Sequence, residues 1–171
     1  MNRNKKKFLA KYGSTDHLNQ LIDDQDQFVR ENAASNIHAN DSHINQLIDD
    51  SSCIVRSSLA SNQNLNRKHL DRLMKDNNAS VRIHVVDSPN ATKEHLDHLM
   101  NDNDPNVRSA LARNQNATKD HLDHLMHDKT WYVRASVVKN QNATKEHLSH
   151  LMTDANPDVG EIAADKMKEL K

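Results

Sequence analysis

Apolar residues follow two alternating helical patterns along the chain. In the first, they come four, seven and eight residues after a serine, asparagine or threonine, as at Leu18, Leu21 and Ile22. In the second, they come at a valine and at four and five residues after it, as at Val133 and Val137. Both spacings place the apolar side chains on one face of a helix, and strand-like alternation does not occur. The sequence therefore predicts pairs of short amphipathic helices without strands.

The helix pairs recur with a fixed period of 26 residues. The valine of the second pattern is followed by arginine in five units and by glycine in the sixth: Val29-Arg30, Val55-Arg56, Val81-Arg82, Val107-Arg108, Val133-Arg134 and Val159-Gly160. A period between about 20 and 50 residues is typical of solenoids, in which each unit buries its apolar face against its neighbours. A single unit is therefore not expected to fold alone.

Two columns of polar residues predict where the helices begin. The first column lies three residues before each valine: Asp26, Ser52, Asn78, Asp104, Thr130 and Asn156. The second column begins at Ser14 and returns eleven residues after each of the next five valines: Asn40, Asn66, Thr92, Thr118 and Thr144. All twelve are residue types whose side chains accept an otherwise unpaired N–H at a helix start. The repeats are therefore expected to start near residues 14, 40, 66, 92, 118 and 144.

The repeats run from residue 14 to residue 171 and predict one repeat domain. Residues 1–13 precede it and are expected to form an N-terminal capping helix that ends at Gly13. The last unit is expected to close with a longer, more polar helix over residues 159–170. Three lysines near its end would compensate the helix dipole: Lys166, Lys168 and Lys171.

An aspartate five residues before each valine completes a D-x4-V-R signature in five units. These aspartates are Asp24, Asp50, Asp76, Asp102, Asp128 and Asp154. The signature resembles that of HEAT-type helical repeats, and the whole unit is similar to the leucine-rich repeat variant. The resemblance covers residues 14–165 and implies an all-α, right-handed α-solenoid of six two-helix repeats, usually a binding scaffold, sometimes with one 3₁₀ helix in each pair. Gln and Lys replace most of the prolines expected after the Asn and Thr of the unit.

The arginine of each unit falls inside the buried arc of the second helix. A partly buried guanidinium needs a carboxylate partner. We therefore expect these arginines to pair with the aspartate column, either across the short turn within a unit or across the boundary between units. Contact with phosphate is the alternative.

Six histidines form a further column, each three residues after the start of a first helix: His17, His43, His69, His95, His121 and His147. Their position at the edge of the buried stripe predicts a structural ladder, and successive histidines about 10 Å apart cannot share a metal ion. His-x-x-His pairs in the last three units leave weak, incidental metal binding open. No dedicated metal site and no cofactor is predicted. Buried imidazoles prefer the neutral form, so stability is expected to fall between about pH 6.5 and 5.

Composition narrows the classes of partner and compartment. The 23 Lys and Arg residues nearly balance the 24 Asp and Glu residues, which gives no general attraction to nucleic acid or to an anionic membrane. Cys53 is the only cysteine, so an intrachain disulfide is excluded and a reducing compartment is favoured. No stretch is apolar enough for a signal peptide or a membrane span. The sequence predicts a soluble cytoplasmic protein.

The surface residues that differ between units are candidates for function. Small residues two and three positions after the valine predict a flat outward row that would admit another chain: Ser57, Ser58, Ser109, Ala110, Ala135 and Ser136. No catalytic motif stands out, so an enzyme is not expected. We expect a scaffold of the adaptor or inhibitor type that binds another protein. Its candidate contact residues, chosen for aromatic character or charge, are Trp131, Tyr132, His84, Arg113 and Lys139.

A nucleic-acid-binding solenoid is the alternative. Basic residues cluster just after the start of the first helices, where a cation opposes the helix dipole and gains nothing locally. These residues would form a phosphate-binding ridge: Arg67, Lys68, Lys93, Lys119 and Lys145. Acidic residues on the same helices, such as Asp120 and Glu146, argue against it because they would repel a polyanion. Membrane binding is not expected.

Overall fold

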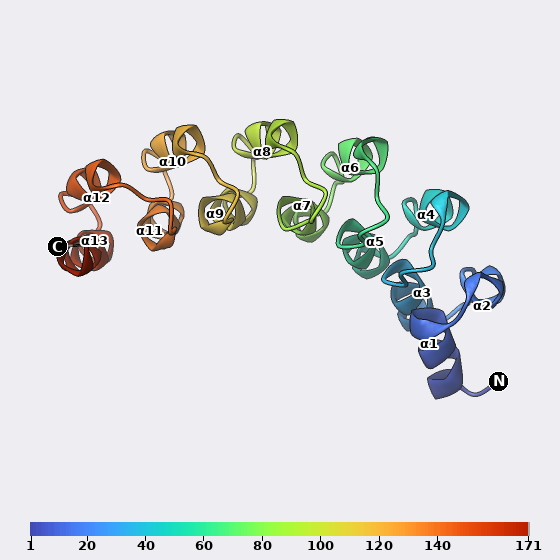
Figure 1. The fold of residues 1–171 in the computed structure, drawn as a ribbon. Helices are drawn as coiled ribbons and strands as arrows, with labels where there is room; N and C mark the ends of the chain where they lie inside the picture. The colour runs from blue at the N-terminus through green and yellow to red at the C-terminus, as the bar shows by residue number, and fades with distance from the viewer. Residues whose placement is uncertain (171) are drawn as a thin grey trace. The chain divides into compact units, whose positions relative to one another are not determined.

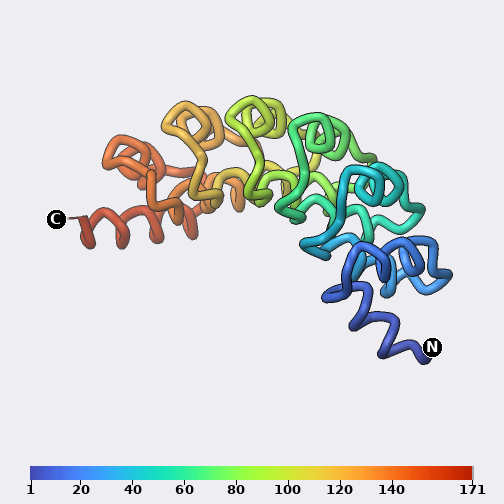
Figure 2. Tube along the Cα trace, turned by 45° about the vertical axis from the view of Figure 1, so that its right-hand side comes forward, coloured from blue at the N-terminus to red at the C-terminus, as the bar shows by residue number. Residues whose placement is uncertain are grey.

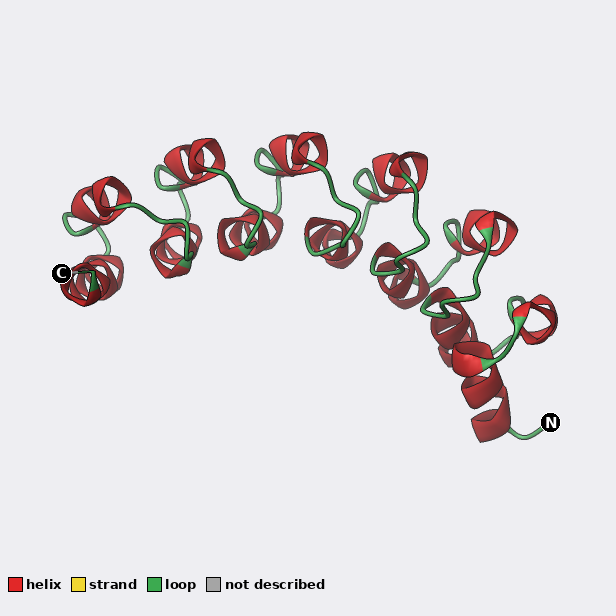
Figure 3. Ribbon diagram, in the orientation of Figure 1, coloured by secondary structure: helices red, strands yellow, loops and turns green. Residues whose placement is uncertain are grey.

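The computed structural model describes residues 1–170, which form thirteen α-helices and no strand (Figures 1 and 3). Helix α1 (Arg3–Tyr12) precedes six pairs. The first members, here called A helices, are α2 (Thr15–Leu21), α4 (Asp41–Leu47), α6 (Arg67–Leu73), α8 (Lys93–Leu99), α10 (Lys119–Leu125) and α12 (Lys145–Leu151). The second members, the B helices, are α3 (Gln27–Ala34), α5 (Cys53–Ala60), α7 (Ala79–Val86), α9 (Pro105–Arg113), α11 (Trp131–Lys139) and α13 (Pro157–Glu169). The predicted helix pairs are confirmed, and no 3₁₀ helix replaces a member of a pair within this range.

The helices pack only against near neighbours in each of two compact units, residues Met1–His95 and a second unit that begins at Leu96. In the first unit α1, α3, α5 and α7 pack in sequence. Helix α2 contacts α1 and α3, and α4 and α6 each contact the B helices on either side. In the second unit α9, α11 and α13 pack in the same way, with α10 and α12 beside them. Figure 2 follows the chain through these pairs. Packing between adjacent repeats alone is the property that defines a solenoid.

The predicted apolar stripes form the core. In the A helices, Leu18 and Leu122 have no exposed surface, and in the B helices the same holds for Val107, Val133 and Val137. The predicted starts of the B helices are also correct. In four of them the aspartate or asparagine of the capping column accepts the N–H of the residue two positions on: Asp26, Asn78, Asp104 and Asn156.

Gly13 ends α1 as predicted, but the reason lies in packing. Its φ is −76°, an ordinary extended value that any residue adopts. A Cβ at this position would lie 2.3 Å from the carbonyl oxygen of Leu9 and 2.8 Å from Cβ of His17. A side chain is therefore excluded by the close approach of α1 to the start of α2.

The predicted outward row of small residues was wrong. Ser57, Ser109, Ala110, Ala135 and Ser136 are all buried, and Ser58 is half-buried. The hydroxyls of Ser109 and Ser136 lie 2.9 Å apart, between α9 and α11. The position two residues after the valine lies about 200° around the helix from it, which suggested solvent. However, the B helix of the next repeat packs against this side, and the small residues allow the two helices to approach closely.

Asparagines in the turns that follow the B helices join successive repeats through backbone carbonyls. Asn62 Nδ2 donates to Ala34 O at 2.7 Å and to Asn36 O at 3.0 Å. Asn140 makes the equivalent pair of bonds, and a second column of asparagines two residues further on does the same: Asn64, Asn90 and Asn142. These asparagine ladders were not predicted from the sequence.

Lys166 takes the place of the asparagine in the last repeat. Its Nζ donates to Val138 O and Asn140 O, both at 2.6 Å, and burial lowers its pKa below the ordinary value. Lys166 lies in the last turn of its own helix as predicted, but its ammonium group binds carbonyls of the preceding repeat, which the sequence did not predict. Lys168 pairs with Asp165 at 2.8 Å, and Lys171 lies outside the described residues.

Ser88 interrupts the first asparagine ladder and provides a test of it. It occupies the position of Asn62 one repeat later, is 3% exposed, and its hydroxyl has no hydrogen-bond partner. In Ser88→Asn, the ladder register directs the new Nδ2 to Ala60 O and Asn62 O. We expect the free energy of unfolding to rise by about 1–2 kcal/mol, measured by urea denaturation. The control Ser61→Asn, at an exposed position, should change it by less than about 0.5 kcal/mol. A less stable Ser88→Asn would contradict the ladder.

Candidate functional site

The arginine and aspartate columns form a ladder that crosses the repeat boundaries. Arg108 Nε donates to Asp128 Oδ2 at 2.5 Å and its Nη2 to Asp128 Oδ1 at 3.0 Å, while Nη1 donates to Asp102 O at 2.7 Å. Three further pairs share this bidentate geometry: Arg30 with Asp50, Arg56 with Asp76, and Arg134 with Asp154. The carboxylate therefore comes from the next repeat and the carbonyl from the same repeat. The predicted structural pairing is confirmed, and it occupies the donors that a phosphate would need.

The ladder also holds its carboxylates in the charged form. Hydrogen bonds from Arg134 are the largest cause that lowers the pKa of Asp154, and they outweigh the opposing effect of burial. Asp154 Oδ1 also accepts the backbone N–H of Asn156 at 2.8 Å, which orders the turn into α13. Each ladder aspartate therefore joins two repeats and shapes the turn before a B helix.

The histidine column caps the A helices. His121 Nδ1 accepts the backbone N–H of Thr118 at 3.0 Å, and Thr118 Oγ1 accepts the backbone N–H of His121 at 3.4 Å. This is a capping box in which imidazole replaces the usual Glu or Gln. The same reciprocal pair begins α2, α4, α6 and α12. The predicted structural role of the histidines is confirmed, and its cause is the helix start.

The second ring nitrogen of several histidines faces the preceding repeat. His121 Nε2 lies 2.8 Å from Asp97 Oδ1, and His147 Nε2 lies 2.8 Å from Asp123 Oδ1. His43 Nε2 lies 2.9 Å from the side-chain oxygen of Asn19. Because Nδ1 accepts the capping N–H, the proton of the neutral ring is placed on Nε2, which donates across the boundary. Both nitrogens are thereby used, so these rings are not free to bind a metal ion.

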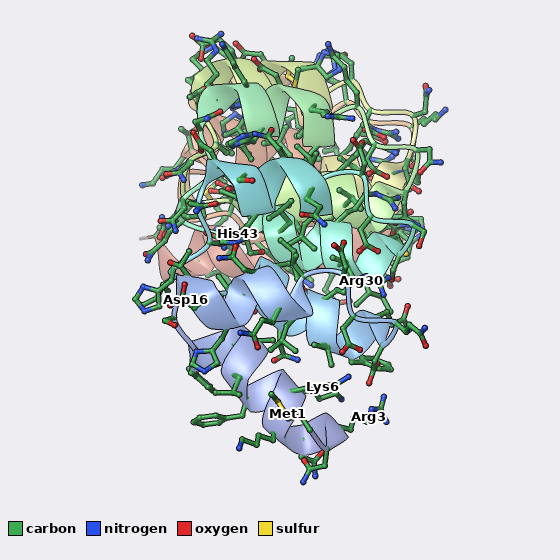
Figure 4. All side chains as sticks on the ribbon, turned by 90° about the vertical axis from the view of Figure 1, so that its right-hand side faces the viewer. Met1, Arg3, Lys6, Asp16, Arg30 and His43 are labelled. Atoms are coloured by element: carbon green, nitrogen blue, oxygen red, sulfur yellow. The ribbon has the colours of Figure 1, made fainter. Side chains whose placement is uncertain are left out.

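His43 and Arg30 show that the two ladders lie at opposite sides of the first unit. In Figure 4 the label of His43 lies at the left of the stack and that of Arg30 at the right. The histidine ladder follows the starts of the A helices, whereas the arginine ladder follows the turns between A and B helices. The arginines of the second ladder lie in the B helices, whereas Trp131, Arg113 and Lys139 take part in neither ladder.

The burial of His43 gives the predicted acid sensitivity a specific origin. Desolvation lowers its pKa below the ordinary value of 6.5. A histidine whose pKa is lower in the folded than in the unfolded state stabilises the fold fully above pH 6.5. This stabilisation is lost as the pH falls through the folded-state pKa. We expect a lower melting temperature at pH 5.5 than at pH 7.5, and a smaller difference in His43→Gln. His38→Gln, at an exposed position, is the control and should retain the full difference. Equal differences in all three proteins would remove His43 as the cause.

Four of the five candidate protein-binding residues lie in α9 and α11 of the second unit, and the fifth lies in α7 of the first unit. Trp131 and Tyr132 begin α11, where Trp131 is 47% exposed, Tyr132 is half-buried, and their ring centres lie 5.9 Å apart. Lys139 is exposed at the other end of α11, about 12 Å along the helix axis, and Arg113 is exposed at the corresponding end of α9. His84 lies in the first unit, is half-buried, and its Nδ1 donates to Ser80 O at 2.7 Å. The structure therefore brings the aromatic pair together and places the two cations along the same row of B helices.

Two exposed apolar residues at the starts of B helices were missed in the sequence. Phe28 is 37% exposed and Ile54 is 39% exposed, and both directly precede the valine, as Tyr132 does. Arg3 and Lys7 of α1 lie over the Phe28 ring, with their charged groups 5.4 and 4.7 Å from its centre. The sequence did contain an indication of these exposed apolar residues, because the residue before the valine is apolar or aromatic in three units.

The basic ridge of the nucleic-acid alternative lies among carboxylates. Lys119 Nζ is 2.8 Å from Asp123 and 3.6 Å from Glu146, and Arg67 is 4.0 Å from Asp71. The remaining three basic residues are exposed: Lys68, Lys93 and Lys145. Acidic and basic side chains thus share one surface, which weakens the field that a polyanion would encounter. The ridge stays a prediction that no contact in the structure favours.

Several hollows of the surface lie along the arginine ladder. One of about 760 Å³ in the first unit is lined by both signs of charge, among them Asp50, Arg56 and Asp76. A smaller one of about 310 Å³ in the second unit is lined by Asp102, Arg108 and Asp128. Within residues 1–170, no group of three or more histidine, cysteine or acidic side chains is placed to hold a metal ion. No helix in that range is long and apolar enough to cross a membrane.

Comparison with solved structures finds one with the same repeat architecture. A leucine-rich repeat variant, described as having a novel repetitive protein structural motif, aligns with 96% of this chain at a TM-score of 0.74 and 25% sequence identity. The alignment spans 66% of that structure's own length. A designed armadillo repeat protein aligns with 98% of this chain and 91% of its own length, at 17% identity and a TM-score of 0.31. No protein-family model matches the chain, and no curated protein sequence matches it. The chain is an all-α repeat protein of the α-solenoid class, similar to the leucine-rich repeat variant.

Proposed function

We propose that this protein is a scaffold that binds another protein on the exposed face of its B helices, as an adaptor or an inhibitor does. The observation that carries the proposal is the exposure of Trp131, which is 47% exposed while the neighbouring Val133 is fully buried. The second unit buries its core without the indole, so folding does not account for the aromatic residue. Trp, Tyr and Arg are the residue types that dominate the energy of protein interfaces.

The charges of the same row suit a protein partner. Arg113 and Lys139 end the two neighbouring helices α9 and α11, and both side chains are exposed. An aromatic anchor with cations at the edge is the usual composition of an interface core and its rim. The partner that this arrangement favours carries an apolar pocket for the indole and acidic groups about one helix length away.

A non-catalytic role is part of this proposal. The residue types that could serve catalysis are engaged in architecture: histidines such as His121 cap helices, and aspartates such as Asp128 pair with arginines. We place the protein in the cytoplasm, because its single cysteine, Cys53, suits a reducing compartment.

The test compares Trp131→Ala with Met152→Ala. Met152 is 44% exposed and follows α12, so it is an apolar side chain of similar exposure away from the B-helix row. We expect Trp131→Ala to weaken binding of the captured protein by about thirtyfold, the effect of losing about 2 kcal/mol, with Met152→Ala unchanged. Affinities are measured by titration after capture from the native cell.

Charge reversal gives an independent outcome for the same face. Arg113→Glu together with Lys139→Glu should slow association and reduce its dependence on salt, since these side chains would lie at the rim of the interface. If Trp131→Ala and the double charge reversal both bind as the unaltered protein does, the B-helix face is not the binding surface.

A further inference from the structure

One contact between successive A helices is found at three repeat boundaries. It joins the second residue after one A helix to the sixth residue of the next. In the first unit Gln46 Nε2 donates to Asp23 Oδ1, and Arg72 Nη2 donates to Asp49 Oδ1. The side chains differ while the contact persists, so the backbone of the repeat brings these two positions together.

In the second unit the same contact is made by two histidines. His127 follows α10 and His150 lies in α12, and their ring centres are 4.7 Å apart with the ring planes at 74°. Both side chains are exposed, and neither ring makes a hydrogen bond to another residue of the described chain. Two imidazoles that make no other side-chain hydrogen bond therefore lie where earlier repeats place an ion pair or a hydrogen bond, with the Asp154 carboxylate near enough to interact electrostatically with His150.

The separation of the rings matches that of two imidazoles on one metal ion. A metal–nitrogen bond of about 2.0–2.1 Å puts an imidazole centre about 3.2 Å from the metal. Two such rings at a square or tetrahedral angle then have centres about 4.5–5.2 Å apart. The observed 4.7 Å lies within this range.

We propose that His127 and His150 bind one divalent transition-metal ion across the boundary between the fifth and sixth repeats. Imidazole suits Cu²⁺, Ni²⁺ and Zn²⁺, and the order of affinities puts Cu²⁺ first. Solvent completes the coordination, because both rings are exposed. The nearby Asp154 is held by Arg134 at 2.6 Å, so the site has two protein ligands.

The preceding repeat supplies a matched control. His124 occupies the position of His150 one repeat earlier, and Asn101 occupies the position of His127. Both line the same hollow beside Arg108 and Asp128. An amide is a poor ligand for Cu²⁺ compared with imidazole, so this pair of positions corresponds to the proposed site but lacks its second imidazole.

The experiment titrates the full chain with CuCl₂ at pH 7.5 in a non-coordinating buffer and follows binding by calorimetry and electron paramagnetic resonance. We expect one strongest Cu²⁺ site per chain with nitrogen ligands. His127→Asn, which converts the contact to that of the preceding repeat, and His150→Gln should each weaken this site by at least about tenfold, because each leaves a single imidazole. His124→Gln should leave it unchanged.

A second readout separates a bridging ion from one held by a single histidine. An ion bound by two repeats at once stabilises the folded chain, so ZnCl₂ should raise the melting temperature of the unaltered protein and of His124→Gln. It should not raise that of His127→Asn. The proposal would be overturned if His127→Asn bound Cu²⁺ and responded to Zn²⁺ as the unaltered protein does. It would also be overturned if His124→Gln lost as much Cu²⁺ affinity as His127→Asn.

Discussion

Asp128→Ala is expected to lower the free energy of unfolding by about 3–5 kcal/mol, the range for breaking a buried ion pair from one side. The Arg108 side chain is only 8% exposed, and its Nε and Nη2 both donate to Asp128. Removing the carboxylate leaves a nearly buried guanidinium without a counter-charge, bonded only to the carbonyls of Asp102 and Asn103 and, at 3.5 Å, to Thr130 Oγ1. The variant also loses the bond from the backbone N–H of Thr130 to Asp128 Oδ1, at 2.8 Å, which shapes the turn before α11.

Urea denaturation of Asp128→Ala beside Asp120→Ala measures this effect. Asp120 belongs to the same repeat but is exposed in the first turn of α10, so its loss should cost no more than about 1 kcal/mol. Replacing both partners, as Arg108→Met with Asp128→Leu, should recover much of the loss, since no unpaired charge remains. If Asp128→Ala costs no more than Asp120→Ala, the ladder does not hold adjacent repeats together.

The sequence predicted those features that are marked by the same type of residue at the same position of every repeat. The starts of the A and B helices follow from capping residues such as Asn40 and Asp104, and these positions recur in every unit. The pairing of arginine with aspartate also followed, because a charge inside the buried arc needs a partner. Which repeat supplies the carboxylate did not follow: Asp102 and Asp128 are equally plausible partners for Arg108 until the packing of adjacent repeats is known.

Features that depend on the backbone of a neighbouring repeat were not predicted. Asn62 donates to carbonyls 26 and 28 residues earlier, and no side-chain pattern marks those acceptors. The burial of Ser109 depends in the same way on the adjacent B helix. The role of His121 could have been predicted, since Thr-x-x-His matches a capping box once imidazole is accepted in place of Glu or Gln.

The candidate site is predictable only in part for a related reason. Positions with the same residue type in every repeat show what the fold requires. They therefore identify the ladders, but they do not identify the surface that binds a partner. Residues that depart from their column carry the functional information, and Trp131 was recognised in this way. Phe28 and Ile54 were missed because their exposure depends on how far α1 and α3 cover the starts of α3 and α5.

Deleting one whole repeat is expected to leave a folded protein. Removal of residues 40–65 takes out α4 and α5 and joins Ala39 to Asn66, so the chain passes from one turn to the next helix start. Helix α7 can then pack on α3 through the kind of contact that α5 makes with both. Since stability is approximately a sum over repeats and their interfaces, the shorter chain should melt cooperatively at a somewhat lower temperature.

Deleting half a repeat is expected to abolish folding of the first unit. Removal of residues 40–52 takes out α4 and leaves α5 directly after the turn that follows α3. The core residues of α3 and α5 then lose the buried side chains of α4, Ile44 and Leu47, that cover them. Arg30 also loses its partner Asp50, and Asn62 loses its register with the carbonyls of Ala34 and Asn36.

The measurement that tests the repeat account most directly is circular dichroism, with thermal melting, of these two deletions beside the full chain. The account predicts the same helical signal per residue and a single cooperative transition for the 26-residue deletion, and a marked loss of helical signal for the 13-residue deletion. Equal loss of structure in both deletions, or equal retention in both, would contradict a fold built from self-contained 26-residue repeats that pack only on their neighbours.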